Sequence, residues 1–94
     1  MLNVDSEDTI DLEEYLIENR PATFSLLMKG NAMQDEGILD GDLVIVERGK
    51  TPKQRDIVVA EIDEEYQLKK MSSLKSNQKT TVVAVVVAIV RKYR

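Results

Sequence analysis

The sequence contains neither histidine nor cysteine among its 94 residues. Without histidine, the chain lacks the side chain that most often serves as a general base and as a transition-metal ligand. Without cysteine, it has no thiolate nucleophile and no disulfide framework, which fits a reducing cytoplasm. Serine–histidine and cysteine–histidine mechanisms are therefore excluded, and proton transfer would have to use Asp, Glu, Lys or Tyr. We expect no metal and no cofactor.

Basic residues are outnumbered along the chain. The 13 Lys and Arg residues against 17 Asp and Glu residues give a formal net charge of −4. Non-specific nucleic-acid binding depends on clustered basic side chains, and the only dense basic group is "RKYR" at residues 91–94. So short a group is typical of a solvated tail, so we expect no direct nucleic-acid binding by this domain.

Long hydrophobic runs are also absent. The longest uncharged run, "TTVVAVVVAIV" at residues 80–90, is well short of the roughly 20 residues that a membrane-spanning helix needs. The N-terminus is acidic, whereas a secretory signal begins with a basic region. We therefore expect a soluble, cytoplasmic protein without membrane contact. Its 43% hydrophobic and 32% charged residues are typical of one small globular domain.

Short apolar segments separated by turn residues predict a mostly β domain. The expected strands cover residues 23–29, 42–47, 56–62, 66–71 and 82–90. The third is apolar on both faces, which predicts an interior strand. The last is rich in valine, so it must be buried on both faces or pair with another chain. It is either a central strand or an edge that joins a second copy.

The N-terminal part is expected to be less compact. Residues 1–9 are polar and acidic and predict a flexible arm, which leaves residues 10–94 as the folded domain. Residues 10–21 predict a short helix that Asp11 caps and Pro21 closes. Its apolar face would consist of Leu12, Tyr15 and Leu16.

The segment "GNAM" has the features of a turn that displays one side chain. Gly30 and Asn31 tolerate unusual backbone dihedral angles, so the first strand can turn sharply there. Ala32 would then begin a new turn, where a side chain projects near unpaired N–H groups, a suitable place for a nucleophile. Alanine, however, offers no lone pair and no acidic proton. The residues alone favour a plain turn with a small buried side chain.

Two longer stretches carry a family resemblance. "TFSLLMKGNAMQDEGILDGDLVIVE" (23–47) and "DIVVAEIDEEYQLKKM" (56–71) resemble the C-terminal domain of the LexA/UmuD-type self-cleaving SOS proteins, which are serine–lysine peptidases. "IDLEEYLIENRPATF" (10–24) and "VVVAIVRKYR" (85–94) are similar to the UmuD-like branch. The resemblance implies twisted, partly barrel-like antiparallel strands with a short N-terminal helical segment.

The resemblance also implies a catalytic site. The family tetrad of glycine, a variable residue, the nucleophilic serine and methionine matches Gly30, Asn31, Ala32 and Met33, and Lys69 matches the general base. A lysine can take the serine proton only as a neutral, desolvated amine. Strand alternation places Lys69 on the face opposite to its apolar neighbours Tyr66 and Leu68.

The sequence departs from the family pattern in several places. Ala32 replaces the nucleophile, so the chain as written should not cleave itself; the intact surroundings favour an introduced substitution over a naturally inactive relative. None of the four glycines follows Ala or Cys, so the cleavable Ala-Gly or Cys-Gly bond is missing. The link at residues 72–81 is shorter than usual, and Arg55 and Glu64 replace glycines of the UmuD-like branch.

The expected function is that of a C-terminal regulatory and dimerisation domain of an SOS-response protein. The resemblance implies a homodimer and, in the parent protein, cleavage stimulated by a RecA filament on single-stranded DNA. The parent would be a transcriptional regulator or the accessory subunit of an error-prone polymerase. The alternatives are a naturally non-catalytic interaction module and a generic small β domain.

Overall fold

The computed structural model describes residues 11–17, 20–75 and 79–93. Within these residues the chain forms one short α-helix, α1 (Leu12–Leu16), and five antiparallel strands. The strands are β1 (Thr23–Leu27), β2 (Leu43–Glu47), β3 (Ile57–Ile62), β4 (Glu65–Lys70) and β5 (Thr80–Val90). Three 3-10 turns lie between them: η1 (Arg20–Ala22), η2 (Gln34–Glu36) and η3 (Met71–Ser73). The mostly β fold predicted from the turn spacing is confirmed.

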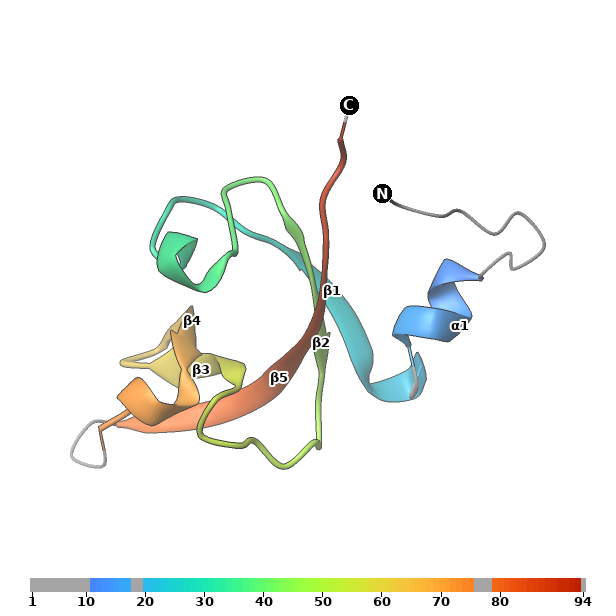
Figure 1. Cartoon of the computed structure of the whole chain (residues 1–94). Helices are drawn as coiled ribbons and strands as arrows, with labels where there is room; N and C mark the ends of the chain where they lie inside the picture. The colour runs from blue at the N-terminus through green and yellow to red at the C-terminus, as the bar shows by residue number, and fades with distance from the viewer. Residues whose placement is uncertain (1–10, 18–19, 76–78, 94) are drawn as a thin grey trace.

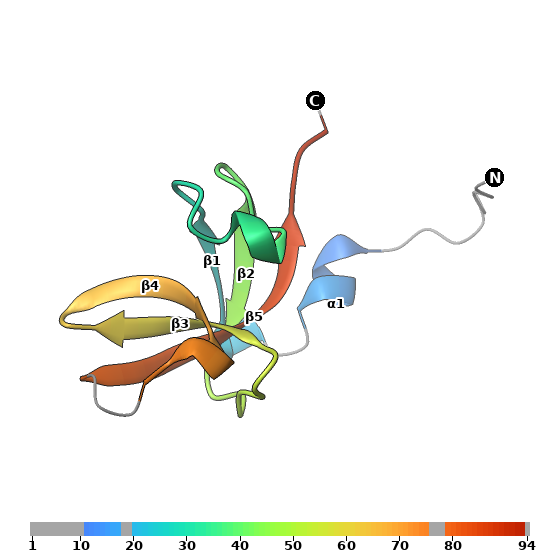
Figure 2. The ribbon, with the colours of Figure 1, turned by 60° about the vertical axis from the view of Figure 1, so that its left-hand side comes forward.

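The five strands form one curved sheet in the order β1-β2-β5-β3-β4. The first half of β5 pairs with β3 from Thr80 to Val85, and the second half pairs with β2 from Val85 to Val90. β5 therefore bends between two halves of the sheet, so that β1 and β2 stand at a steep angle to β3 and β4 (Figures 1 and 2). The sheet curls in the partly barrel-like way expected from the resemblance, but it does not close.

The valine-rich strand is central where it is paired. Val85 lies opposite both Val58 of β3 and Glu47 of β2, so the middle of β5 has a neighbour on each side. Beyond it, residues 86–90 pair with β2 on one side, and no strand in the described part of the chain pairs with their other side. The middle of β5 therefore fits the predicted central strand, and residues 86–90 fit the predicted edge that joins a second copy.

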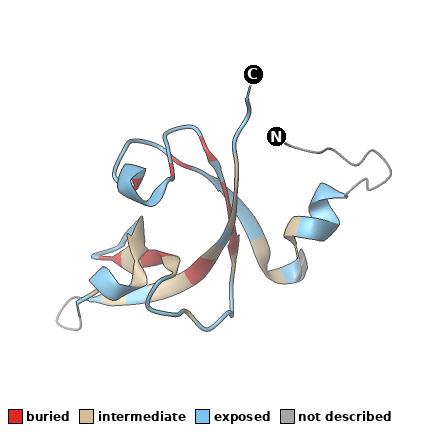
Figure 3. Ribbon diagram, in the orientation of Figure 1, coloured by how far each residue is buried: buried red, intermediate tan, exposed pale blue. Residues whose placement is uncertain are grey.

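Apolar side chains fill both faces of the sheet around β3. The two clusters lie on opposite sides of β3, because neighbouring β3 residues belong to different clusters, with Val59 in the first and Val58 in the second. The first cluster consists of Met28, Met33, Ile38, Val44, Val46, Val59 and Ala84. Figure 3 shows the buried residues concentrated along the central strands. The predicted interior position of the third strand is confirmed, and the order of strands explains it.

The N-terminal helix is shorter than the sequence pattern predicts. Asp11 does cap it, accepting hydrogen bonds from the backbone N–H groups of Glu13 and Glu14 at 3.0 and 3.3 Å. The helix ends at Leu16, ahead of Pro21. Its predicted apolar face stays largely in solvent, with Leu12 and Tyr15 at 67% and 69% exposure, because a five-residue helix offers too little surface to pack. The expected arm at residues 1–9 lies outside the described residues.

The hairpin between β3 and β4 turns through Asp63 and Glu64. Both residues have positive φ angles, 51° and 69°, as a two-residue type I′ turn requires. Asp tolerates the left-handed region, but Glu suffers a steric penalty there that Gly does not. The sequence therefore places an unfavourable side chain at the second turn position.

We expect Glu64→Gly to stabilise the domain by about 0.5–1 kcal/mol, because relief of the left-handed penalty outweighs the added freedom of glycine in the unfolded chain. Thermal unfolding followed by circular dichroism measures the change. Glu65→Gly, one residue later in β4, is the matched control and should destabilise the domain, since glycine weakens a strand. Equal effects of the two substitutions would contradict this account of the turn.

Candidate active site

The "GNAM" segment forms an exposed turn between β1 and η2. Gly30 has a φ angle of 86°, and its backbone N–H donates to Oδ1 of Asp40 at 2.6 Å. Ala32 is exposed, whereas the next side chain, Met33, points into the first apolar cluster. The plain interpretation of a small buried residue is therefore wrong: the turn presents residue 32 to solvent and anchors itself through Met33.

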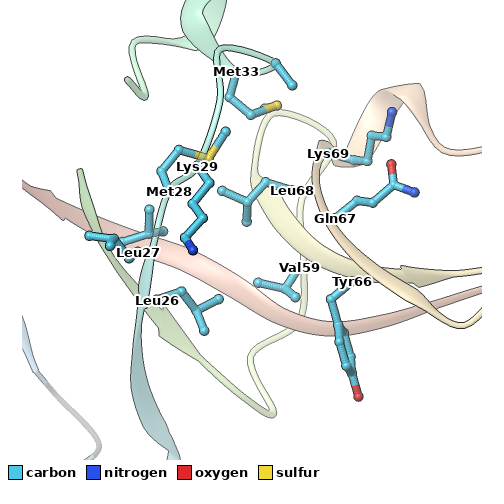
Figure 4. A pocket seen from close by; sticks show the side chains of 12 residues that line it. Leu26, Leu27, Met28, Lys29, Met33, Val59, Tyr66, Gln67, Leu68 and Lys69 are labelled. Atoms are coloured by element: carbon cyan, nitrogen blue, oxygen red, sulfur yellow. The ribbon is translucent and has the colours of Figure 1, made fainter. Parts of the chain in front are cut away.

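The turn overlooks a cleft of about 480 Å³. One wall comes from the end of β1 and the residues after it, including Leu27 and Met28, and the other comes from β4 (Figure 4). Ala32 and Lys69 both line this cleft, although they are far apart in the sequence. The fold therefore brings the two positions that match the family dyad to one site.

Lys69 is half-buried on the β4 wall of the cleft. In the β3–β4 pairing it stands opposite Val58, while its neighbour Leu68 stands opposite Val59. Figure 4 shows the Lys69 and Gln67 side chains extending to the same side of β4, with Leu68 turned the other way, toward Met28. The predicted alternation along β4 is confirmed: Leu68 packs against the first apolar cluster, and Lys69 lies on the opposite side of the strand, half-buried, among the residues that line the cleft.

A second lysine of β4 contacts η2, the 3-10 turn that follows the "GNAM" segment, which we call the display turn (residues 30–33). Lys70 stands opposite Ile57, and its Nζ lies 3.5 Å from Oε1 of Glu36 in η2. The sequence reasoning missed this contact, although the doubled lysine was a visible signal. The ion pair joins β4 to the 3-10 turn that follows residue 32. Both partners are partly exposed, so its energy is small.

A buried carboxylate holds the loop behind the turn. The Asp42 side chain is only 2% exposed, and it accepts hydrogen bonds from Arg91 Nε to Oδ1 at 2.6 Å and from Arg91 Nη2 to Oδ2 at 2.7 Å. The same Nη2 also donates to the Gly37 carbonyl at 2.8 Å. The interpretation of residues 91–94 as a solvated tail did not anticipate this pair.

The Arg91 hydrogen bonds, followed by one from the Leu39 N–H, lower the pKa of Asp42 to about 2. A carboxyl whose pKa is lower in the folded state than in the unfolded state stabilises the fold above its unfolded pKa, near 4. That stabilisation is lost as the pH falls through about 2. The pair therefore remains intact throughout the neutral and mildly acidic range.

Two other kinds of site are absent from the described ranges. These residues contain no group of three or more His, Cys, Asp or Glu side chains that could hold a metal ion. They also contain no helix of the length and apolarity that crossing a bilayer demands.

Comparison with known proteins identifies the family. The family model described as Peptidase S24-like matches residues 2–85. The chain belongs to the S24-like peptidase family. It is 41% identical to Protein ImpA of Salmonella typhimurium over 66 residues, which is 70% of this chain and 46% of that protein. It is 45% identical to the LexA repressor of Clostridium novyi over 64 residues, which is 68% of this chain and 31% of the repressor.

These matches confirm the resemblance to the LexA/UmuD-type self-cleaving proteins. Protein SamA of Salmonella typhimurium is similar as well, with 38% identity over 66 residues, covering 70% of this chain and 47% of that protein. The S24-like chain thus spans less than half the length of the curated relatives that it matches. The roles of residue 32 and Lys69 remain predictions from the matched motif.

Proposed function

We propose that this chain is the C-terminal regulatory domain of a self-cleaving SOS-response protein, with residue 32 at the nucleophile position and Lys69 as the general base. The observation that carries the proposal is that Ala32 and Lys69 line one cleft. Because alanine has no hydroxyl, the chain as written does not cleave. Restoring serine at position 32, in a chain extended upstream through a cleavable bond, tests the assignment.

The chemistry is intramolecular peptide hydrolysis through an acyl-enzyme. A serine hydroxyl at position 32 would attack the scissile carbonyl while a neutral lysine amine takes its proton. The oxyanion needs preorganised donors, and the backbone N–H groups of Ala32 and Met33 donate no hydrogen bond in the described part of the chain. Lys69 has a flexible four-carbon stem, so its amine can move within the cleft toward residue 32.

The substrate is an extended peptide segment. β1 pairs only with β2 among the described strands, so its other edge is open beside the cleft. Leu26 and Leu27 are exposed on this strand, and Tyr66 is exposed on the opposite, β4 wall of the cleft. A scissile segment with apolar side chains can add to this edge as a strand and bury these residues.

The domain also forms a homodimer through the open edge of β5. Residues 86–90 offer backbone N–H and C=O groups on the side that β3 leaves free. A second copy of the same edge, related by a two-fold axis, satisfies these groups in antiparallel pairing. The pairing extends the sheet across the two copies and covers the valine-rich half of the strand.

Val87→Lys should weaken this dimer, because Val87 is exposed on that edge and two-fold pairing brings the two introduced ammonium groups close together. We expect the dimer Kd to rise by about tenfold or more, measured by sedimentation equilibrium. Thr81→Lys is the matched control: it is exposed in the half of β5 that β3 already covers, so the Kd should not change. A dimer equally sensitive to both changes would rule out this edge.

For the parent protein we propose one of two roles. It is a cytoplasmic transcriptional regulator or the accessory subunit of an error-prone polymerase, cleaved on contact with a RecA filament on single-stranded DNA. A naturally non-catalytic interaction module is the alternative, favoured by the alanine at position 32. If the Ala32→Ser chain stays intact even when it is extended upstream through a cleavable bond, that result would support the module, since the restored serine would then have no competent base in the cleft.

A further inference from the structure

Arg91 occupies an unusual place for a residue near the end of the chain. It follows β5 directly, and its guanidinium binds both oxygens of a carboxylate 49 positions earlier in the sequence, at 2.6 and 2.7 Å. The planar fork of arginine matches a carboxylate in this two-bond geometry, which a lysine ammonium cannot reproduce. The third bond, to the Gly37 carbonyl at 2.8 Å, extends the contact to the start of the same loop.

Asp42 in turn connects the loop to the end of β1. Its Oδ2 accepts the Leu39 N–H at 2.8 Å, which fixes the loop internally. Its backbone carbonyl accepts the Met28 N–H at 2.9 Å, and the Met28 carbonyl accepts the Gly41 N–H at 2.8 Å. A reciprocal pair of backbone bonds thus locks the loop against the residue that leads into the display turn.

The display turn is attached to the same loop at both of its ends. On one side, the Gly30 N–H donates to Asp40 Oδ1 at 2.6 Å. On the other side, the Ile38 N–H donates to the Met33 carbonyl at 3.2 Å. Residue 32 lies between these two attachments, and its methyl side chain can form no hydrogen bond of its own. Its position therefore depends on where the loop at residues 37–42 sits.

We propose that Arg91 is a positioning residue for the active site: by clamping Asp42 and the Gly37 carbonyl, it fixes the loop that sets the place of residue 32. The effect of Arg91 on the cleavage rate rests on the proposed peptidase function. Its effect on the position of the loop does not. Nucleophilic attack requires the reacting atoms at about 3–3.5 Å, and a misplacement of about 1 Å costs on the order of a hundredfold in rate. A clamp at residues 37 and 42 acts on that distance without touching the substrate.

The structural part is tested in the chain as it stands, with Ala32 in place. Amide hydrogen exchange is measured by NMR in the unmodified chain and in the variants Arg91→Ala and Arg91→Lys. We expect exchange at Gly30, Ile38 and Gly41 to accelerate by about tenfold or more, while the amides of β3 and β4 stay protected. Lys92→Ala is the matched control, because Lys92 is exposed and makes no hydrogen bond or ion pair in the described residues.

The catalytic part uses the same variants in the extended chain that carries Ala32→Ser. We expect Arg91→Ala to lower the cleavage rate by roughly 10–100-fold and Arg91→Lys to recover only part of it. The dependence of the rate on pH should keep its shape, since the base is unchanged, and each rate is taken far below the unfolding temperature of its variant. Lys92→Ala should leave the rate unchanged.

The outcomes separate the two proposals. If the extended Ala32→Ser chain does not cleave, the proposed function fails. The hydrogen-exchange data still test whether Arg91 fixes the loop at residues 37–42. If it cleaves and Arg91→Ala leaves both rate and exchange unchanged, the clamp is overturned. The clamp is also overturned if Arg91→Lys behaves as the unmodified chain, because the two-bond geometry would then be unnecessary. Uniform loss of amide protection in both variants would overturn it as well, since Arg91 would then be a general stabilising residue.

Discussion

Self-cleavage should appear when Ala32 is replaced by serine in a chain extended upstream of residue 1 through an Ala-Gly or Cys-Gly bond. The parent with alanine has no hydroxyl to attack the peptide, so its cleavage should be undetectable. The serine variant has the nucleophile on an exposed turn, and Lys69 lines the same cleft. The neighbouring backbone N–H groups of residues 32 and 33 donate no hydrogen bond to any described residue, so they are available to the oxyanion. Appearance of the two fragments is followed by gel electrophoresis and mass spectrometry, which also locates the broken bond.

The two neighbouring lysines supply the sharpest control for this experiment. In the extended Ala32→Ser chain, Lys69→Ala should lower the rate by about 10²–10⁴-fold, the usual contribution of a general base. Lys70→Ala removes only the partly exposed ion pair with Glu36, so the rate should fall by no more than about fivefold. The reverse order would move the base to Lys70, which lies on the same side of β4 as Leu68.

The pH dependence gives a further check on the base. A lysine amine accepts a proton only when it is neutral, so the rate should climb as the solution is made more alkaline. The Asp42–Arg91 pair does not contribute to this rise, because the pKa of Asp42 is about 2 and its carboxylate is ionised throughout. A rate that is flat between neutral and alkaline pH would argue against any lysine base.

Local patterns in the sequence predicted the strands well. Five apolar segments bounded by glycine, proline and acidic turns became five strands, because such segments have few other ways to bury their side chains. The alternation in "YQLKKM" placed Leu68 and Lys69 on opposite sides of β4, as the register shows. The N-terminal helix was overestimated: it ends at Leu16, and Leu12 and Tyr15 match a helical period but stay exposed.

Contacts between distant residues were beyond such patterns. Nothing near "RKYR" signals that Arg91 reaches a buried aspartate 49 positions away, because a charge run on its own is typical of a solvated tail. The position of β5 between β2 and β3 likewise depends on the topology of the whole sheet and not on its own valines. The exposure of Ala32 fits the display turn that the resemblance implies, whereas the residues alone favoured a buried alanine, because local composition does not show that the buried side chain of this turn is Met33.

The apolar support beneath the display turn leads to the largest expected loss of stability. Ile38 is 2% exposed and belongs to the same cluster as Met28 and Met33, whose backbones flank the turn. Ile38→Ala leaves a cavity that the surrounding sheet fills only in part, so the free energy of unfolding should fall by about 2–5 kcal/mol. For a domain of this size, each 1 kcal/mol lowers the Tm by roughly 4–8 °C.

Urea unfolding at fixed temperature measures this loss, and two variants calibrate it. Leu39→Ala, at the next position, should cost less than about 1 kcal/mol, because the Leu39 side chain is 38% exposed. Ile38→Val removes one methylene and should cost about 0.5–1.5 kcal/mol. Similar losses for Ile38→Ala and Leu39→Ala would mean that Ile38 is not packed as described. Combined with Ala32→Ser in the extended chain, Ile38→Ala should also slow cleavage, since the Met33 side chain that anchors the turn would lose a packing partner.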